Sequence, residues 1–315
     1  MKTITLPGVP LPAPVVMLGL MRIAEKSDAE IRDLVNAARE SGIDFLDHAD
    51  IYGGDWHRSE ARFADALRLT PSQRAEFTIQ TKCGIVPRMP TYQDTYYDFS
   101  YEHVVSQVEG SLRALRTDYL DILLLHRPDA LMEPDEVARA FDDLERSGKV
   151  RAFGVSNHTP GQIALLKTAV RQPLIVNQLQ LSLTHAPLVT HGMASNIATL
   201  DQSVSRDVGT LDYCRLNGIT IQAWSPFQIG DGSGVFLGSP AYPELNALID
   251  SLAASYQVPP LAIATAWLTR HPAQFQVVLG TTNPARVRQA ALGSALPLTR
   301  PEWYALLRAA GHRVP

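Results

Sequence analysis

The stretch FLDHADIYGG, residues 45–54, places ionisable side chains inside an apolar segment. Asp47, His48, Asp50 and Tyr52 supply carboxylate, imidazole and phenol groups, which transfer protons in general acid–base catalysis. Such side chains also occur for structural reasons, because short acids cap helices and buried tyrosines mostly pack. The segment is therefore either a strand with structurally satisfied polar groups or a strand that ends in an active site.

Two more reactive side chains end apolar segments further along the chain. Lys82 lies at the end of FTIQTKC, and His126 ends YLDILLLH. Each has an ordinary interpretation, since a lysine can extend its stem to reach solvent and a histidine after an apolar strand can form structural hydrogen bonds. Their occurrence together with Asp47 and Tyr52 at the ends of successive segments favours a reaction centre.

Short apolar segments that suit buried strands alternate with longer segments of helical periodicity. The helical segments carry start and stop signals, such as Ser27 before residues 28–42 and Pro134 in a first turn. Eight such units predict an α/β fold, a (β/α)8 TIM barrel, in which the carboxyl ends of the strands converge on one face. The expected strands are residues 15–20, 45–49, 77–83, 119–126, 152–156, 175–182, 219–225 and 276–280.

Three long connections follow expected strands three, six and seven, at residues 86–100, 183–204 and 227–240. Loops of this length in compact domains are mostly functional, and after a strand they belong to the catalytic face of a barrel. The turn-rich segment PGVPLP before the first strand predicts an N-terminal hairpin that closes the other end. We expect one domain over residues 1–315.

Composition narrows the class of protein. The 315 residues carry 28 basic and 32 acidic side chains, a net charge of −4, with no basic run of the kind that binds nucleic acid. We find no signal-peptide pattern and no apolar run of the ~20 residues that span a membrane. Cys83 and Cys214 lack metal-site spacing. These features predict a cytoplasmic protein without a membrane or nucleic-acid partner, and they leave its oligomeric state open.

The order of these motifs resembles the aldo-keto reductases over nearly the whole chain. Asp47-HADI-Tyr52, TKC around Lys82 and LLLHRPD around His126 match the family's pattern after strands two, three and four. SGKVRAFGVSN (147–157) matches the fifth strand, and VNQLQLS, AWSPF and VVLGTTNPARVRQA match the later cofactor-binding segments. Within the family, DHADIYGG, LLLHRPDALM and AAGHRVP resemble a bacterial branch of poorly characterised oxidoreductases.

The resemblance implies reduction of aldehydes or ketones by a nicotinamide, without a metal. Tyr52 is then the general acid, and Lys82 lowers the pKa of its phenol from a free value of about 10. Asp47 pairs with Lys82, and His126 orients the carbonyl. His48 and Asp50 stay outside this catalytic set, and Glu60 starts a helix where its charge suits the dipole.

The resemblance also implies a cofactor site. Ser156, Asn157 and Gln178 hold the carboxamide, Trp224 stacks on the nicotinamide ring, and Ser225 and Phe227 follow the pyrophosphate. Thr281, Arg286 and Gln289 hold the adenosine end. Arg286 favours NADPH because its planar fork suits a phosphate. Gly280 and Ala290 depart from the lysine and asparagine that are frequent there, which leaves NADH as an alternative.

The pocket for a small-molecule carbonyl substrate is expected at the long loops. The side chains that we expect to line it are Arg22, Trp56, Tyr96, Tyr97, Phe99 and Arg127. Two other functions remain open. One is a regulatory protein that carries the nicotinamide as a redox sensor and turns over slowly. The other is a Schiff-base enzyme that uses Lys82 as nucleophile, which leaves the cofactor motifs unexplained.

Overall fold

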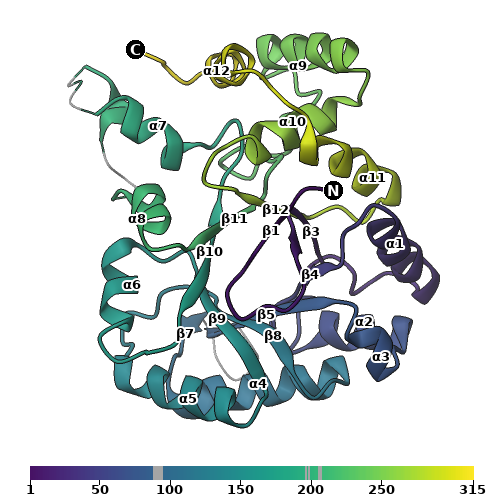
Figure 1. The fold of residues 1–315 in the computed structure, drawn as a ribbon, viewed down its shortest axis with the longest axis vertical. Helices are drawn as coiled ribbons and strands as arrows, with labels where there is room; N and C mark the ends of the chain where they lie inside the picture. Colours follow the sequence, from purple (N-terminus) through teal and green to yellow (C-terminus); the bar gives the residue numbers. More distant parts are fainter. Residues whose placement is uncertain (88–94, 196, 198, 205–207) are drawn as a thin grey trace.

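The computed structural model describes residues 1–87, 95–195, 197, 199–204 and 208–315. Eight parallel strands close into a barrel in chain order, which confirms the (β/α)8 prediction (Figure 1). Strand β12 pairs with β3 and completes the ring. The strands are β3 (Val16–Gly19), β4 (Phe45–Asp47), β5 (Thr78–Cys83), β8 (Leu120–Leu125), β9 (Val150–Ser156), β10 (Leu174–Gln180), β11 (Thr220–Trp224) and β12 (Gln276–Leu279). Nearly every strand residue is buried, because helices cover the outside and side chains fill the inside.

Helices surround the barrel in the order that the sequence predicts. Ser27 forms a capping box with Glu30 at the start of α1, and Pro134 occupies the first position of α5. In the described part of the chain, no helix is long and apolar enough to cross a bilayer. The helices are α1 (Asp28–Glu40), α2 (Arg58–Leu67), α3 (Pro71–Arg74), α4 (Tyr101–Leu115), α5 (Pro134–Arg146), α6 (Pro160–Leu166), α7 (Pro187–Met193), α8 (Thr210–Leu216), α9 (Pro243–Tyr256), α10 (Pro260–Thr269), α11 (Pro284–Leu292) and α12 (Arg300–Ala309), with short 3-10 turns η1 (Asp201–Ser203) and η2 (Gly293–Ala295).

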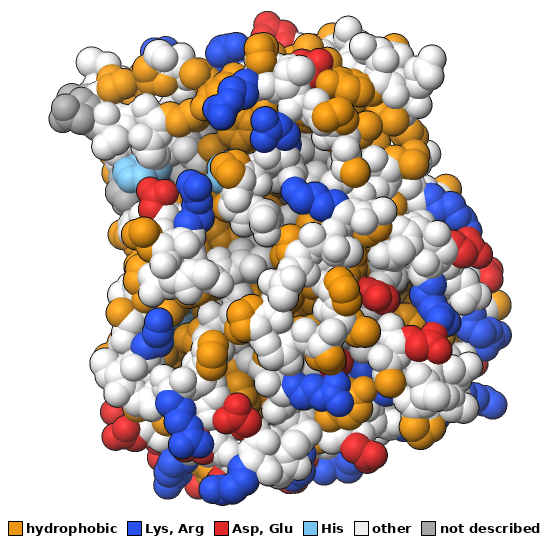
Figure 2. Space-filling model, in the orientation of Figure 1, with side chains coloured by type: hydrophobic (Ala, Val, Ile, Leu, Met, Phe, Trp, Pro, Cys, Tyr) orange, Lys and Arg blue, Asp and Glu red, His pale blue; other side chains and the backbone are white. Residues whose placement is uncertain are grey.

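The predicted N-terminal hairpin is present as β1 (Thr3–Ile4) and β2 (Ala13–Pro14). Its turn crosses the amino end of the barrel, where Leu6 is buried and a methyl on Gly8 would meet Ala152 at the start of β9. Lys2 Nζ donates to the carbonyl of Thr269, the last residue of α10. Acidic and basic side chains are interspersed over the face that Figure 2 shows, without a single-sign patch.

The three long connections are partly structured. The connection after β5 forms a small hairpin of β6 (Ile85–Val86) and β7 (Tyr96–Tyr97). Helix α7 and η1 lie in the connection after β10, and a bridge between Gln228 and Val235 folds the one after β11. Residues 88–94 of the first predicted loop and 196 and 198 of the second lie outside the described residues.

Gly154, in the middle of β9, is required by close packing. A methyl there would lie 2.5 Å from Val176 Cγ2 and 2.8 Å from the Val176 carbonyl oxygen, which belongs to rigid backbone. We expect Gly154→Ala to lower the free energy of unfolding by about 1–3 kcal/mol, the usual cost of overpacking. Urea unfolding would measure the change. Gly161→Ala in α6 is the matched control, because a methyl there meets nothing within 4 Å; equal behaviour of the two variants would contradict the packing argument.

Candidate active site

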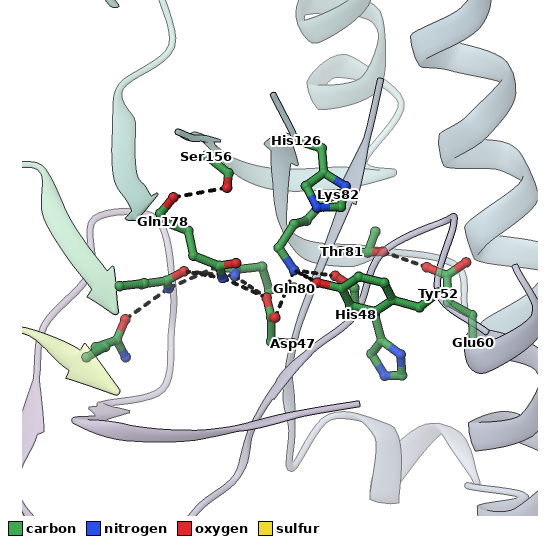
Figure 3. A network of polar contacts seen from close by, with 12 residues as sticks. Asp47, His48, Tyr52, Glu60, Gln80, Thr81, Lys82, His126, Ser156 and Gln178 are labelled. Atoms are coloured by element: carbon green, nitrogen blue, oxygen red, sulfur yellow. Dashed lines mark hydrogen bonds and ion pairs between the residues drawn. The ribbon is translucent and has the colours of Figure 1, made fainter. Parts of the chain in front are cut away.

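The ammonium group of Lys82 is the centre of the polar cluster inside the barrel (Figure 3). Its Nζ donates to Asp47 Oδ2 at 2.8 Å, to the His48 carbonyl at 2.7 Å and to Tyr52 Oη at 3.1 Å. Lys82 is fully buried and Asp47 is 2 % exposed. Three of the four predicted catalytic residues therefore form one directly bonded group, and all three donors of the ammonium are used.

Four glutamines extend this cluster across the barrel interior. Gln80 and Gln178 donate from Nε2 to Asp47 Oδ1 at 2.7 and 3.0 Å, and both also donate to Gln222 Oε1. Gln222 donates in turn to Gln276, whose own amide donates to the Pro14 carbonyl. The strand register explains the layer, since Asp47 pairs with Gln80 and Gln222 with both Gln178 and Gln276. The amide donors hold the Asp47 carboxylate in the orientation that pairs with Lys82.

Burial and charge set the protonation of Lys82 and Tyr52. Burial disfavours the Lys82 ammonium, but the attraction of Asp47 and Tyr52 outweighs it and raises the Lys82 pKa above its ordinary value. Burial raises the pKa of the Tyr52 phenol, and Lys82 lowers it by less, so the net shift is upward. Lys82 therefore lowers the pKa of the phenol, as expected, but burial of Tyr52 is the larger effect in the protein alone.

His126 directly follows β8 and lies beside Tyr52. The two ring centroids are 6.0 Å apart in an edge-on arrangement, and the His126 backbone amide donates to the Cys83 carbonyl. Burial, followed by the charges of Lys82 and Arg127, holds the pKa of the imidazole well below its usual value. The ring is therefore neutral at physiological pH and can donate one hydrogen bond.

Behind the cluster lies a second set of buried polar side chains, which the sequence analysis did not connect. Glu60 is fully buried and accepts from Thr81 Oγ1 at 2.6 Å and contacts His57 Nδ1 at 2.7 Å. Glu60 lies in the first turn of α2, as predicted, and its side chain points into the protein. His48 packs edge-on against Phe63, and burial lowers its pKa to about 4. Burial and the Glu60 charge raise the pKa of Asp50 well above its ordinary value.

The residues expected to hold a carboxamide lie at adjacent strand ends. Ser156 Oγ donates to the Gln178 carbonyl at 3.0 Å, and Asn157, in a left-handed conformation, donates to Ser156 Oγ at 2.8 Å. The half-buried Trp224 ring is anchored by its Nε1, which donates to Asn157 Oδ1 at 3.1 Å. Gln178 Nε2 already serves Asp47 and Gln222. An aromatic ring beside amide and hydroxyl groups suits a nicotinamide, so these residues fit the group.

The other predicted cofactor residues line the ends of β11 and β12. Ser225 adopts a left-handed conformation and donates to Gln228, and Phe227 is half-buried. Thr281 follows β12, Arg286 lies exposed in the first turn of α11, and Gln289 is half-buried one turn later. Ala290 is buried in the core.

The residues predicted to line the substrate pocket are dispersed. Arg22 Nη1 donates to the carbonyl of Gly280, among the predicted cofactor residues. Phe99 is 1 % exposed and stacks on His158 under Gly84, so it packs the core and does not face an open pocket. Trp56 is half-buried against His57 and His103, whereas Tyr96, Tyr97 and Arg127 are exposed.

The arrangement supports proton donation by the Tyr52 phenol to an oxygen placed between Tyr52 and His126. Lys82 is unsuited to act as a Schiff-base nucleophile, because its raised pKa keeps the amine protonated and its three donors are bonded. In the described part of the chain no group of three or more His, Cys, Asp or Glu side chains could hold a metal ion.

The comparisons with known proteins agree with this geometry. The family model described as "Aldo/keto reductase family" matches residues 15–309. The 6-dehydroglucose reductase of Agrobacterium fabrum is 36% identical over 297 residues, covering 92% of both chains. The oxidoreductase YdhF of Escherichia coli is 38% identical over 290 residues, covering 90% of both.

Solved structures share the fold. The glycerol dehydrogenase from Gluconobacter oxydans superposes with a TM-score of 0.76 at 24% identity, covering 98% of this chain and 95% of that one. An aldo/keto reductase from Klebsiella pneumoniae in complex with NADP and acetate superposes with a TM-score of 0.73 at 22% identity, covering 98% and 94%. At this identity the likeness concerns the barrel alone.

Proposed function

The chain belongs to the aldo/keto reductase family, and from that premise we propose that it reduces aldehydes or ketones with NADPH. Tyr52 is the general acid, Lys82 and Asp47 tune it, and His126 orients the carbonyl. The observation that carries this proposal is the bonded chain Asp47–Lys82–Tyr52, with contacts of 2.8 and 3.1 Å. It supplies a phenol and a fixed positive charge, and the neutral imidazole of His126 lies beside the phenol.

A nicotinamide held by Ser156, Asn157 and Gln178 would supply the hydride that the carbonyl carbon receives. The chain's own residues stabilise the negative charge that then develops on the carbonyl oxygen. The Tyr52 phenol gives its proton to that oxygen, and the Lys82 ammonium stabilises the tyrosinate that remains, because the two groups already share a hydrogen bond. Neutral His126 donates a hydrogen bond to the same oxygen and fixes its position. Asp47 keeps Lys82 charged throughout.

NADPH is the cofactor that we infer, with NADH as the alternative. Ser156, Asn157 and Gln178 would hold the carboxamide, and Trp224 would lie against the ring. One further observation favours a nicotinamide phosphate: Arg286 is an exposed cation at the start of α11.

For the substrate, we infer a polyhydroxylated aldehyde. Two relatives at 36% identity, from Agrobacterium fabrum and Novosphingobium aromaticivorans, are named 6-dehydroglucose reductase. The exposed side chains near the strand ends include Tyr97 and Arg127, which can donate hydrogen bonds to hydroxyl groups.

NADPH oxidation by the purified protein tests the function. We expect turnover with 6-dehydroglucose and with an activated aromatic aldehyde such as 4-nitrobenzaldehyde. The kcat/KM should be about 10-fold or more higher for the sugar, the effect of roughly 1.4 kcal/mol of extra polar contact. A protein that binds NADPH but oxidises it with no aldehyde or ketone of a broad panel would contradict the reductase assignment and support the redox-sensor alternative. Turnover of the aromatic aldehyde without turnover of the sugar would contradict the substrate class alone.

A further inference from the structure

Arg22 lies against the backbone of Gly280, although the two residues are 258 positions apart in the sequence. The Arg22 Nη1 donates to the Gly280 carbonyl at 2.7 Å. A Cβ atom built on Gly280 would lie 3.0 Å from the same nitrogen, so a larger residue at position 280 would force the guanidinium to move. The contact forms because β3 and β12 are neighbours and Arg22 and Gly280 follow their carboxyl ends.

Arg22 and Arg286 are charged groups without an acidic partner. Neither has a carboxylate within ion-pair distance among the residues that the structure describes, and both are exposed. Arg22 uses one of its five N–H donors on the carbonyl of Gly280. Arg288, on the same helix as Arg286, is paired with Glu40 at 2.8 Å. Two uncompensated guanidinium groups at one rim of the barrel provide a site for a dianion.

We propose that Arg22 binds the 2′-phosphate of NADPH together with Arg286, and that it is a cofactor-specificity residue instead of a substrate-pocket residue. Gly280 occupies the position where the family frequently has a lysine, so β12 brings no cation there. Arg22 brings a guanidinium to the same place from the end of β3, on the other side of the seam between β12 and β3. A guanidinium suits the role because its planar fork can bind two phosphate oxygens while another of its donors holds the Gly280 carbonyl. The inference rests on the proposed use of a nicotinamide cofactor.

Equilibrium binding without any carbonyl substrate tests this role. Quenching of tryptophan fluorescence gives Kd for NADPH and NADH, and calorimetry gives Kd for 2′,5′-ADP and 5′-ADP. We expect Arg22→Ala to weaken NADPH and 2′,5′-ADP by about 10-fold or more, the range of a hydrogen bond to a charged group, with less than about 2-fold change for NADH and 5′-ADP. Arg288→Gln removes an equal charge from the same helix as Arg286 and should leave all four constants within about 2-fold.

A second experiment moves the positive charge from the end of β3 to the end of β12. The double variant Arg22→Ala/Gly280→Lys places the cation on the other strand end, in the space that the guanidinium vacates, and should recover most of the lost NADPH affinity. Equal weakening of NADPH and NADH in Arg22→Ala would overturn the proposal and place Arg22 on the pyrophosphate. Unchanged constants would also overturn it, while the reductase function would stand if the wild type still bound NADPH and reduced aldehydes. A wild type that bound neither nicotinamide would overturn both.

Discussion

Replacement of Tyr52 by phenylalanine is expected to lower kcat for aldehyde reduction by about 10²–10⁴-fold, the usual contribution of a positioned general acid. The phenol is the group that can deliver a proton at the centre of the cluster, because Lys82 Nζ, 3.1 Å from Tyr52 Oη, is committed to Asp47 and to the His48 carbonyl. Steady-state kinetics with NADPH and 4-nitrobenzaldehyde measure the loss. Since burial raises the Tyr52 pKa above its ordinary value, the donor stays protonated through neutral pH, and the wild-type rate should fall only as pH rises through that raised value.

Two comparisons separate a chemical effect from a structural one. The Kd of NADPH and the urea midpoint should change little in Tyr52→Phe, because the ring stays in place. Tyr101→Phe is the matched control, since its hydroxyl bonds Asp143 on the outside of the barrel at 2.7 Å; it should keep near-normal kcat. Retention of near-normal kcat by Tyr52→Phe would show that another group donates the proton.

Removal of the positive charge of Lys82 should be the most destabilising single change at the site. In Lys82→Met, the Asp47 carboxylate, 2 % exposed, keeps its two amide donors but loses its cation. Breaking a buried ion pair in this way costs about 3–5 kcal/mol of unfolding free energy. We also expect reductase activity to be lost, because the Tyr52 phenol loses its charged neighbour.

Urea unfolding of three variants tests this account. The double variant Asp47→Asn/Lys82→Met contains no uncompensated charge and should recover a large part of the stability while remaining inactive. Lys26→Met removes an exposed ion pair with Glu30, which is worth about 0.3–0.5 kcal/mol on a helix surface. If Lys82→Met were as mild as Lys26→Met, the ion pair with Asp47 could not be what keeps the carboxylate buried.

The barrel was predictable because its signals are local. Apolar runs such as residues 119–126, bounded by helical segments, predict strands whichever strands they pair with, and chain order then gives the ring. Asp47, Lys82 and Tyr52 follow from the same argument, since the ends of successive parallel strands must converge. The structure adds that their side chains touch.

The features that sequence reasoning missed depend on contacts between distant strands. Gln80 and Gln222 look like polar interruptions in apolar strands, and only the register shows that they form a layer around Asp47. Arg22 is predicted to line the substrate pocket, but the closure of β12 on β3 brings it to Gly280. Phe99 was assigned to the pocket as an aromatic residue in a loop, whereas the absence of a side chain at Gly84 lets its ring enter the core.

The seam between β3 and β12 also has a consequence for how the chain assembles. Val16 pairs with Val277, and Gln276 donates to Pro14, so the ring closes only when segments about 260 residues apart meet. Contacts of such sequence separation form slowly, because the loop entropy is lost before the contact forms. During synthesis, the edge of β3 that pairs with β12 stays unpaired until nearly the whole polypeptide has emerged from the ribosome. If Arg22 and Arg286 hold the adenosine phosphate from the two sides of this seam, the nicotinamide would bind only the closed ring, and its cellular concentration would influence how long the newly made barrel stays closed.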